Sequence, residues 1–498
     1  MSRSLPPLTL SLVSIVLFWS VVDAAHAGPP NLQTPELKHD IDGDSRPTTP
    51  NHGPKLGELI SPLSLTPFVA LLLCIAIFPL ANPDWWEHNR NKTLIASILG
   101  LPTAAYLLTY GPPGMHSLEH VAKEYVSFIV LLGSLFIISG GVYVRGAFHG
   151  SPVINTTFLA LGACLASFIG TTGASMLLLR PLLRANQRRR SMGHVVVFFI
   201  FIVSNCGGLL TPLGDPPLYI GFLKGVPFEW TLQLWKQWAF VNGSLLITFF
   251  AWDTLASHRE SRTAAEKEPL ETLLSPETFG INGQHNFWGL AGIIAVIYCS
   301  GQGIGNGGQV YSWGVQDGLM VAITAICYWW TSAAIRANNR FSFGPIIEVA
   351  ILFSGIFVTM IPALALLSVH GRGLGIETPA QFFWVSGMLS SFLDNAPTYL
   401  TFAVTACGIH GVNTEEGRYL AEFLKLPVAV EAARILAAIS CGSVFMGANT
   451  YIGNGPNLMV KAIAEENNVR MPGFFGYMAY SGGVLIPILI ATTFLFFV

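Results

Sequence analysis

Long apolar stretches separated by short polar loops run along the chain from about residue 61 to the C-terminus. A run of about 20 apolar residues is enough to cross a bilayer as a helix. The pattern therefore predicts an all-α polytopic membrane protein. Single crossings are expected near residues 61–81, 93–110, 121–143, 193–222, 238–255, 287–300, 317–335, 345–368, 429–464 and 473–498.

Two of these crossings carry the same interruption. Residues 204–218 read SNCGGLLTPLGDPPL, and residues 443–457 read SVFMGANTYIGNGPN. Both follow the pattern S-x3-G-x2-T-x2-G-[DN]-x-P, whose glycines and prolines do not allow a continuous helix. Broken backbone persists at membrane depth only where protein or a water-filled cavity satisfies its N–H and C=O groups. Paired interruptions of this kind indicate two discontinuous transmembrane helices at the binding site of a secondary transporter.

Two further apolar stretches, 153–183 and 381–407, are predicted to be re-entrant hairpins. The first has Arg145 before it and a run of arginines after it. Basic loops are typical of the cytoplasmic side, so both flanks belong there, and a single crossing would separate them. The polar hairpin tips are predicted at residues 170–175 and 393–398.

Counting the crossings gives opposite orientations to two parts of the chain, 121–255 and 345–498. The sequence therefore predicts two inverted-topology repeats, each with one hairpin and one discontinuous helix. The first lies in an N-terminal transport half, 60–255, and the second lies in a C-terminal transport half, 286–498. The polar residues between the halves, 256–285, are expected to form a cytoplasmic connector.

The N-terminus has the features of a secretory signal peptide over residues 1–27. Arg3 precedes an apolar run, and Ala25-His26-Ala27 provides a small-x-small cleavage site. An uncleaved first helix is the alternative. Residues 28–59 are rich in proline and charge, which predicts a disordered periplasmic tail.

Composition supports a membrane protein and excludes several other classes. The chain is 52% hydrophobic and 11% charged, whereas soluble domains are about 25% charged. A net charge of −2 provides no basic surface for nucleic acid. The seven cysteines form no CxxC pair and are expected to be small buried residues. Phosphate-loop, dinucleotide and metalloprotease motifs are absent, and no histidine occurs at the tips or interruptions, so we expect no enzyme and no cofactor.

The two tips and the two interruptions are expected to converge at the membrane midplane and to line one cavity. Their oxygen atoms suit a hard cation such as Na⁺. The predicted lining residues are Thr171, Thr172, Ser175, Ser204, Asn205, Thr211, Asp215, Asp394, Asn395, Thr398, Asn449, Thr450 and Asn454.

Asp215 and Asp394 are the predicted carboxylate ligands of Na⁺. A carboxylate at membrane depth usually marks an ion or proton path. Burial favours its protonated form and a bound cation favours its ionised form, so Na⁺ and H⁺ compete for it. This competition is a minimal mechanism for antiport. The alternative role of both aspartates is to cap the helices that follow them.

Other ionisable residues are expected at the ends of the crossings. Glu124 is a candidate for supplying protons from outside, and His194 is expected at the surface. Interfacial positions are predicted for Asp253, Asp317, Glu348 and Glu431.

The chain resembles the NhaD-type sodium/proton antiporters, which are grouped with arsenite permeases and citrate carriers in the ion-transporter superfamily. The resemblance is carried by residues 170–183, 204–228, 390–402 and 447–457 and covers roughly residues 60–498. It implies alternating access, exchange of Na⁺ or Li⁺ for H⁺ across a bacterial inner membrane, and in many members a homodimer.

Two alternatives remain open, a sodium-coupled citrate or dicarboxylate transporter and an arsenite permease-like carrier. Related divalent-anion symporters hold a carboxylate at Ser-Asn-Thr tips. In this chain Asp394 adds an anion at the second tip, and neither tip contains Arg or Lys. The resemblance and the tips together favour a small inorganic cation as the substrate.

Overall fold

The computed structural model describes most of the chain beyond its N-terminal segment. The described residues are 56–145, 150–187, 189, 191–264, 280–306, 311–339, 341–370, 373, 375–414 and 417–498. The predicted signal peptide, the predicted tail up to residue 55 and residues 265–279 of the predicted connector lie outside these ranges.

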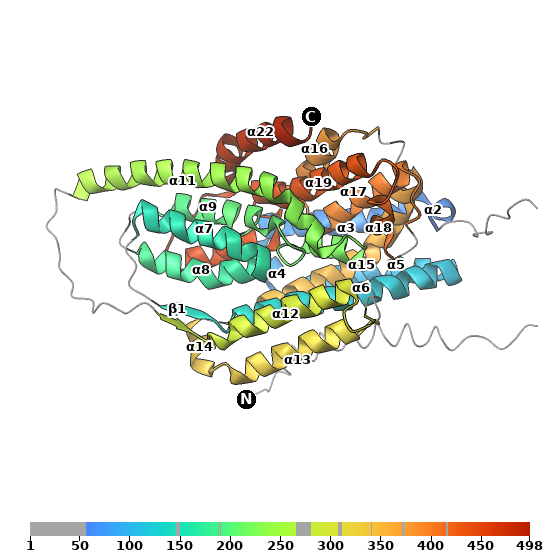
Figure 1. The fold of residues 1–498 in the computed structure, drawn as a ribbon, viewed down its shortest axis with the longest axis horizontal. Coiled ribbons are helices and arrows are strands. Elements are labelled where there is room, and N and C mark those ends of the chain that lie inside the picture. The colour runs from blue at the N-terminus through green and yellow to red at the C-terminus, as the bar shows by residue number, and fades with distance from the viewer. Residues whose placement is uncertain are drawn as a thin grey trace, which may run out of the picture.

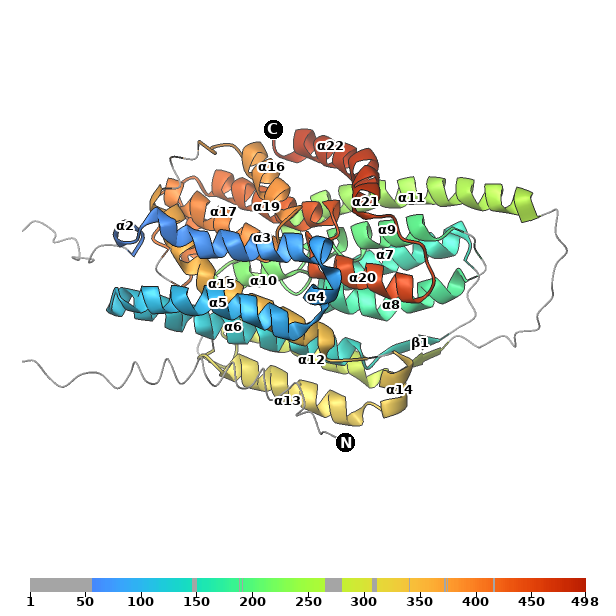
Figure 2. The same ribbon diagram turned by 180° about the vertical axis from the view of Figure 1, so that it is seen from behind.

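The described part is a bundle of helices, most of which run along the long axis of the molecule (Figures 1 and 2). Its first elements are α2 (Leu56–Leu59), the 3-10 helix η1 (Pro62–Leu65), α3 (Thr66–Ala81), α4 (Pro83–Glu87), α5 (Asn89–Leu108) and α6 (Pro112–Ser139). The last four residues of the predicted tail thus form α2, which packs against α15 (Gly344–His370).

The first interruption lies in the next group of elements. The order is β1 (Tyr143–Arg145), α7 (Pro152–Ile169), α8 (Thr171–Ala185), α9 (Gly193–Ile202), η2 (Cys206–Leu209), α10 (Pro216–Leu223), η3 (Phe228–Leu234) and α11 (Trp235–Ala264). The helix α9 therefore ends before the interrupting sequence, and α10 begins at Pro216 near the end of that sequence, so the helix is broken as the glycines and prolines predict.

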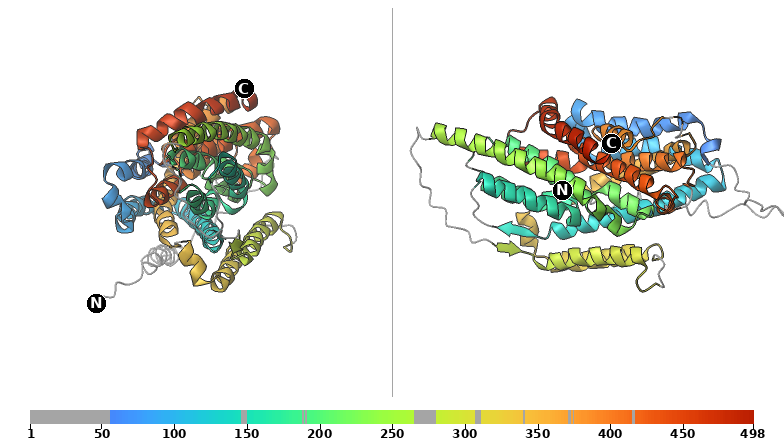
Figure 3. Two further views of the ribbon diagram at one scale, coloured as in Figure 1. Left: turned by 90° about the vertical axis from the view of Figure 1, so that its left-hand side faces the viewer. Right: turned by 45° about the horizontal axis from the view of Figure 1, so that its top comes forward.

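A short sheet leads into the next helices. β2 (Gly280–Asn282) pairs antiparallel with β1, with Tyr143 opposite Asn282. The sequence pattern predicted only helices, because three-residue strands carry no periodic signal. The elements that follow are α12 (His285–Gln302), α13 (Val315–Trp330), α14 (Ala333–Asn338) and α15. Figure 3 shows α12 and α13 at the edge of the bundle, where they pack against each other and against α6.

The second interruption lies in the last group of elements. The order is α16 (Pro379–Ser390), α17 (Asn395–Ile409), α18 (Tyr419–Phe423), α19 (Ala429–Met446), η5 (Gly447–Asn449), α20 (Gly455–Glu466), α21 (Phe474–Tyr480), the π-helix η6 (Ser481–Leu485) and α22 (Ile486–Phe496). A helix break falls at each predicted tip. Gly170 alone separates α7 from α8 and has a φ of +79°.

Seven helical segments in the described residues are long and apolar enough to cross a membrane. They are Pro62–Pro79, Pro112–Ser139, Pro152–Ile169, Phe228–Glu260, Gly344–Leu367, Ala429–Asn449 and Phe474–Phe496. The chain is therefore a multi-pass membrane protein. The crossings predicted at 93–110, 287–300 and 317–335 are helical, but their helices α5, α12 and α13 are not among the seven. The re-entrant paths and the inverted orientation of the repeats stay predictions.

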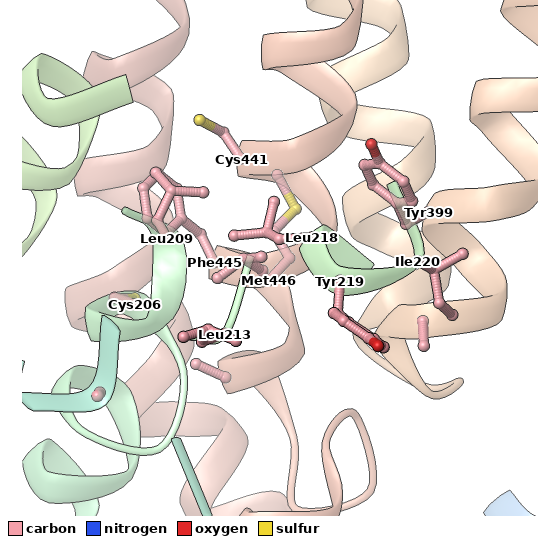
Figure 4. Packing of buried hydrophobic residues seen from close by; sticks show 14 of the residues in the cluster. Cys206, Leu209, Leu213, Leu218, Tyr219, Ile220, Tyr399, Cys441, Phe445 and Met446 are labelled. Atoms are coloured by element: carbon pink, nitrogen blue, oxygen red, sulfur yellow. The ribbon is translucent and has the colours of Figure 1, made fainter. Parts of the chain in front are cut away.

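The residues around the two interruptions are buried. Apolar side chains of η2 and α10, including Leu209 and Leu218, lie close to Phe445 and Met446 of α19 (Figure 4). Cys206 and Cys441 are buried in the same cluster, as expected for small apolar residues. Cys164 is exposed instead. This close packing places the two interruptions side by side.

Candidate functional site

The carboxylate of Asp215 is hydrogen-bonded by side chains from three distant segments. Thr171 Oγ1 donates to Oδ1 over 3.1 Å, and Asn395 Nδ2 donates to Oδ2. Asn454 Nδ2 lies 3.4 Å from Oδ1. Asp215 is only 1% exposed. Both predicted tips and both interruptions therefore meet at this one carboxylate.

Each residue of this group stands at the beginning of a helix. Thr171 begins α8 and Asn395 begins α17, while Asp215 and Asn454 are the N-caps of α10 and α20. The N-terminus of a helix carries about half a unit of positive charge and exposes free N–H groups. Four such ends around one point create a site that favours negative charge.

Asp215 and Asp394 differ in what their side chains bind. Asp394 accepts a hydrogen bond from the backbone N–H of Ala396 over 3.1 Å, which is the capping contact considered as the alternative role. Asp215 makes no side-chain cap bond to α10. Its carboxylate is directed instead toward the other segments of the site.

Three asparagine side chains join the two interruptions beside Asp215. Asn205 Nδ2 donates to Asn457 Oδ1 over 2.7 Å, and Asn454 Nδ2 donates to Asn205 Oδ1 over 3.1 Å. Asn457 Nδ2 donates to the carbonyl oxygen of Gly447 over 2.9 Å. The sequence prediction missed Asn457, because the position that matches it in the first interruption is Leu218.

The two interruptions have the same backbone conformation at matching positions. Asp215 has φ −147° and ψ 145°, and Asn454 has φ −152° and ψ 139°. In each interruption two glycines lie against one another: a Cβ atom on Gly453 would lie 2.6 Å from the carbonyl oxygen of Gly447. Gly208 and Gly214 make the matching contact. A Cβ atom at Gly208, Gly214 or Gly453 would therefore clash with backbone atoms.

The predicted threonines of the interruptions support the backbone. Thr211 Oγ1 donates to the carbonyl oxygen of Ser167, and Thr450 Oγ1 donates to that of Ser391. Each threonine hydroxyl also accepts from a backbone N–H two residues later, over 3.1 Å at Leu213 and 3.2 Å at Ile452. Both threonines therefore have a structural role, because each hydroxyl is hydrogen-bonded to the backbone.

Donors from the following helix satisfy the carbonyl groups of the first interruption. Trp238 Nε1 donates to Gly207 O over 3.0 Å, and Asn242 Nδ2 donates to Cys206 O over 3.1 Å. Both donors lie on α11, one helical turn apart. They complete hydrogen bonds that the broken helix cannot make.

The second interruption is supported in the same way. Tyr477 Oη donates to Ala448 O and Ser481 Oγ donates to Asn449 O, both over 2.8 Å. Tyr477 and Ser481 stand 239 positions after Trp238 and Asn242, the spacing that separates the two interruptions. The correspondence between the two halves thus extends beyond the motif.

The remaining predicted residues lie around this centre. The hydroxyls of Ser175 and Ser204 are 2.9 Å apart and fully buried. Thr398 Oγ1 donates to the carbonyl oxygen of Asp394 over 2.9 Å, and Asn449 Nδ2 donates to Ser391 Oγ over 2.9 Å. Thr172 is half-buried on α8 and stands outside the hydrogen-bonded group.

Some buried oxygen atoms near the centre have no hydrogen-bond partner within the described ranges. They are Asn395 Oδ1, Asn449 Oδ1 and Ser443 Oγ. Buried polar atoms are normally paired, and amide oxygens are suitable ligands for a hard cation. Among the described residues, no three His, Cys, Asp or Glu side chains gather at one point, so a transition-metal site has no support there.

His194 is buried, contrary to the expected surface position. It is 4% exposed, and its Nε2 lies 2.8 Å from Asp253 Oδ1. Arg189 forms an ion pair with the same carboxylate, and Asn155 Nδ2 donates to it over 2.9 Å. The sequence gives no signal for this cluster, because its members come from three separate helices and a loop.

Comparison with protein families finds a match that extends over nearly the whole chain. Residues 57–497 match the CitMHS_2 family, which is described as putative citrate transport. No curated protein matches the chain. The narrower resemblance to NhaD-type antiporters stays a prediction. With its multi-pass helical fold, the chain is a membrane transporter rather than an enzyme, and it belongs to this citrate transport family.

Proposed function

We propose that the protein is a cation-coupled secondary transporter of citrate or a similar carboxylate. The observation that supports this most directly is the meeting of four helix N-termini at Asp215. Half-helix N-termini in transporters are suited to anionic groups of a substrate. Membership of the citrate transport family supports the same substrate class.

Asp215 provides a mechanism for coupling the carboxylate to a cation. In the structure its own carboxylate takes the donors Thr171, Asn395 and Asn454. A second carboxylate beside it would be repelled. When Na⁺ or H⁺ neutralises Asp215, the donors and the positive helix ends become available to the substrate. Citrate then binds well only after the cation, which is the requirement for symport.

Exchange of Na⁺ or Li⁺ for H⁺ is the second candidate. Asp215 forms no ion pair with an Arg or Lys of the described chain, and the amide oxygen of Asn395 is free beside it. These two oxygen donors suit a sodium ion that replaces a proton. The capping bond of Asp394 makes Asp215 the principal carboxylate in either mechanism.

The remaining parts of the proposal concern architecture. We infer two inverted repeats, with α7–α8 and α16–α17 as re-entrant hairpins, in a bacterial inner membrane. The equal spacing of the interruptions and of their supporting donors favours this arrangement. A homodimer remains part of the proposal on the basis of resemblance alone.

Transport assays in proteoliposomes distinguish the two candidates. Radiolabelled citrate uptake is measured under an inward Na⁺ gradient, under an inward proton gradient and with neither. An internal pH dye in the same vesicles reports proton movement after Na⁺ or Li⁺ addition without citrate. Gradient-dependent citrate accumulation supports symport. Proton release on Na⁺ addition without citrate uptake supports antiport and overturns the primary proposal.

A further inference from the structure

A second group of ionisable side chains lies on α6 and at the end of α10, outside the site at Asp215. Glu124 Oε1 is 2.5 Å from Lys224 Nζ and 3.2 Å from His120 Nε2. The His120 side chain is 36% exposed near the polar start of α6, while Glu124 and Lys224 are buried. Lys224 is also the C-cap residue of α10, the helix that Asp215 begins.

Asp317 of α13 is directed toward the same face of α6. Ser127 Oγ donates to Asp317 Oδ2 over 2.8 Å, and Ser127 stands one turn after Glu124. Asp317 is 7% exposed, and its Oδ1 has no hydrogen-bond partner in the described chain. Within the described ranges, the neutral hydroxyl of Ser127 is thus the only group that is hydrogen-bonded to the Asp317 carboxyl.

The surroundings of Asp317 favour its neutral form. An uncompensated charge within a membrane protein costs several kcal/mol. The chain does compensate a buried aspartate elsewhere, since Asp253 is bound by Arg189, His194 and Asn155. Asp317 forms no ion pair with any described residue. A proton on its unpaired oxygen would remove the charge while Ser127 keeps its bond to the other oxygen.

We propose that Asp317 and Ser127, together with Glu124, form a second proton-binding site, which exchanges protons with water at His120. Loading takes one proton from hydronium and forms one O–H bond on the Asp317 carboxyl. Release reverses both changes, and no electron is transferred. Glu124 and His120 supply titratable groups between that carboxyl and water.

Other charged and titratable groups surround this site. From α10, Lys224 faces Glu124, and the Tyr219 hydroxyl accepts from Gln316 Nε2 over 3.3 Å. From α18, the ring of Tyr419 lies 5.5 Å from Lys224 Nζ. On α6 itself, Glu119 and Lys123 pair over 2.6 Å. These groups contribute to the electrostatic potential at the carboxyl groups of Glu124 and Asp317.

The helix α10 connects this proton site to the site at Asp215. Its N-cap is Asp215 and its C-cap is Lys224, so the helix joins the two sites. A proton on Glu124 weakens the attraction that holds Lys224 against α6. A role in coupling rests on the proposed cation-coupled transport, whereas proton binding at Asp317 does not.

Infrared spectroscopy of the purified full-length protein tests proton binding without transport. We expect a protonated carboxyl C=O band at neutral pH that disappears in Asp317→Asn and remains in Asp215→Asn. A band unchanged by Asp317→Asn would show that Asp317 is ionised and would overturn the proposal. Ser127→Ala should shift this band by removing its hydrogen bond, which provides a second test if Asp317→Asn does not fold.

Transport measurements test the coupling role separately. In proteoliposomes, Asp317→Asn and Glu124→Gln should flatten the dependence of uptake on external pH and should leave measurable uptake. Asp215→Asn should abolish the cation-driven accumulation of citrate at every pH. Unchanged pH profiles in both peripheral variants would rule out the coupling role. Failure of the proposed substrate would instead appear as absent citrate uptake in the wild-type protein.

Discussion

Asn395, the first residue of α17, donates a hydrogen bond to the carboxylate of Asp215, 180 positions earlier in the chain. The bond joins the second predicted tip to the first interruption. Because its acceptor is a buried carboxylate, it belongs to the stronger class of hydrogen bonds. The bond couples the ionisation of Asp215 to the position of α17: a change in either one affects the other.

Replacing Asp215 tests the centre of the site. Asp215→Asn keeps the shape of the side chain and removes the charge to which a cation binds. We expect substrate accumulation driven by a cation gradient to fall to background, and cation binding to weaken about 30-fold or more, the equivalent of about 2 kcal/mol. Binding of Na⁺ by calorimetry and uptake in proteoliposomes provide the measurements.

Asp84→Asn is the matched control, since Asp84 is an exposed carboxylate outside the site. It should transport at the wild-type rate. Full activity in Asp215→Asn would remove Asp215 from the mechanism.

Replacing Asn395 separates the donor from the acceptor. Asn395→Ala leaves the Asp215 carboxylate without one of its donors, and we expect KM for the substrate to rise about tenfold, the equivalent of about 1.4 kcal/mol. Asn395→Asp places a second carboxylate against Asp215 and should reduce transport further, because like charges repel. Concentration series in proteoliposomes give both values. Equal activity of the two variants would contradict the role of charge.

Glycine contacts allow a sharp test of the interruptions. A Cβ on Gly453 would meet the backbone of Gly447, whereas a Cβ on Gly455 has open space. Gly453→Ala should therefore reduce the free energy of unfolding by about 1 to 3 kcal/mol, as expected for an overpacked site. The melting temperature and the yield of folded protein should fall with it. Gly455→Ala should be close to wild type. Thermal unfolding followed by fluorescence measures both, and equal melting temperatures would contradict the close backbone contact.

The donors to the broken helices can be removed one atom at a time. Tyr477→Phe deletes the hydroxyl that binds Ala448 O and leaves a buried carbonyl without its donor. We expect a loss of about 1 to 3 kcal/mol in the free energy of unfolding.

A hydroxyl without such a role provides the comparison. Tyr298→Phe removes a hydroxyl for which the described chain provides no hydrogen-bond partner, and Tyr298 is 42% exposed. Its unfolding should match that of the wild-type protein. A similar loss in both variants would indicate a general effect of the hydroxyl rather than support of the interruption.

The helix breaks could be predicted from sequence because their causes are local. Glycine and proline at residues 204–218 and 443–457 act on the backbone wherever they occur. The repeated motif also led to Asp215 and Asn454, which the structure places in contact. Local patterns are sufficient when the same residues break the helix and contribute the polar side chains.

Tertiary partners could not be predicted in the same way. Asn457 has no polar counterpart in the first interruption, and His194 is buried where Asp253 and Phe249 of α11 approach it. The single capping bond of Asp394 depends on the angle at which α17 begins. These features arise from the packing of the helices, which the spacing of residues along the chain does not reveal.

The distribution of the donors around Asp215 has a consequence for biosynthesis. Thr171 lies about a third of the way along the polypeptide and Asn454 lies near its end, so a ribosome must translate almost the whole message before the pocket can exist. The helices of the first half would insert into the membrane before the residues that complete their polar centre have been synthesised. Either half produced alone should be inert, and co-expression of two fragments cut between α11 and β2 should restore activity.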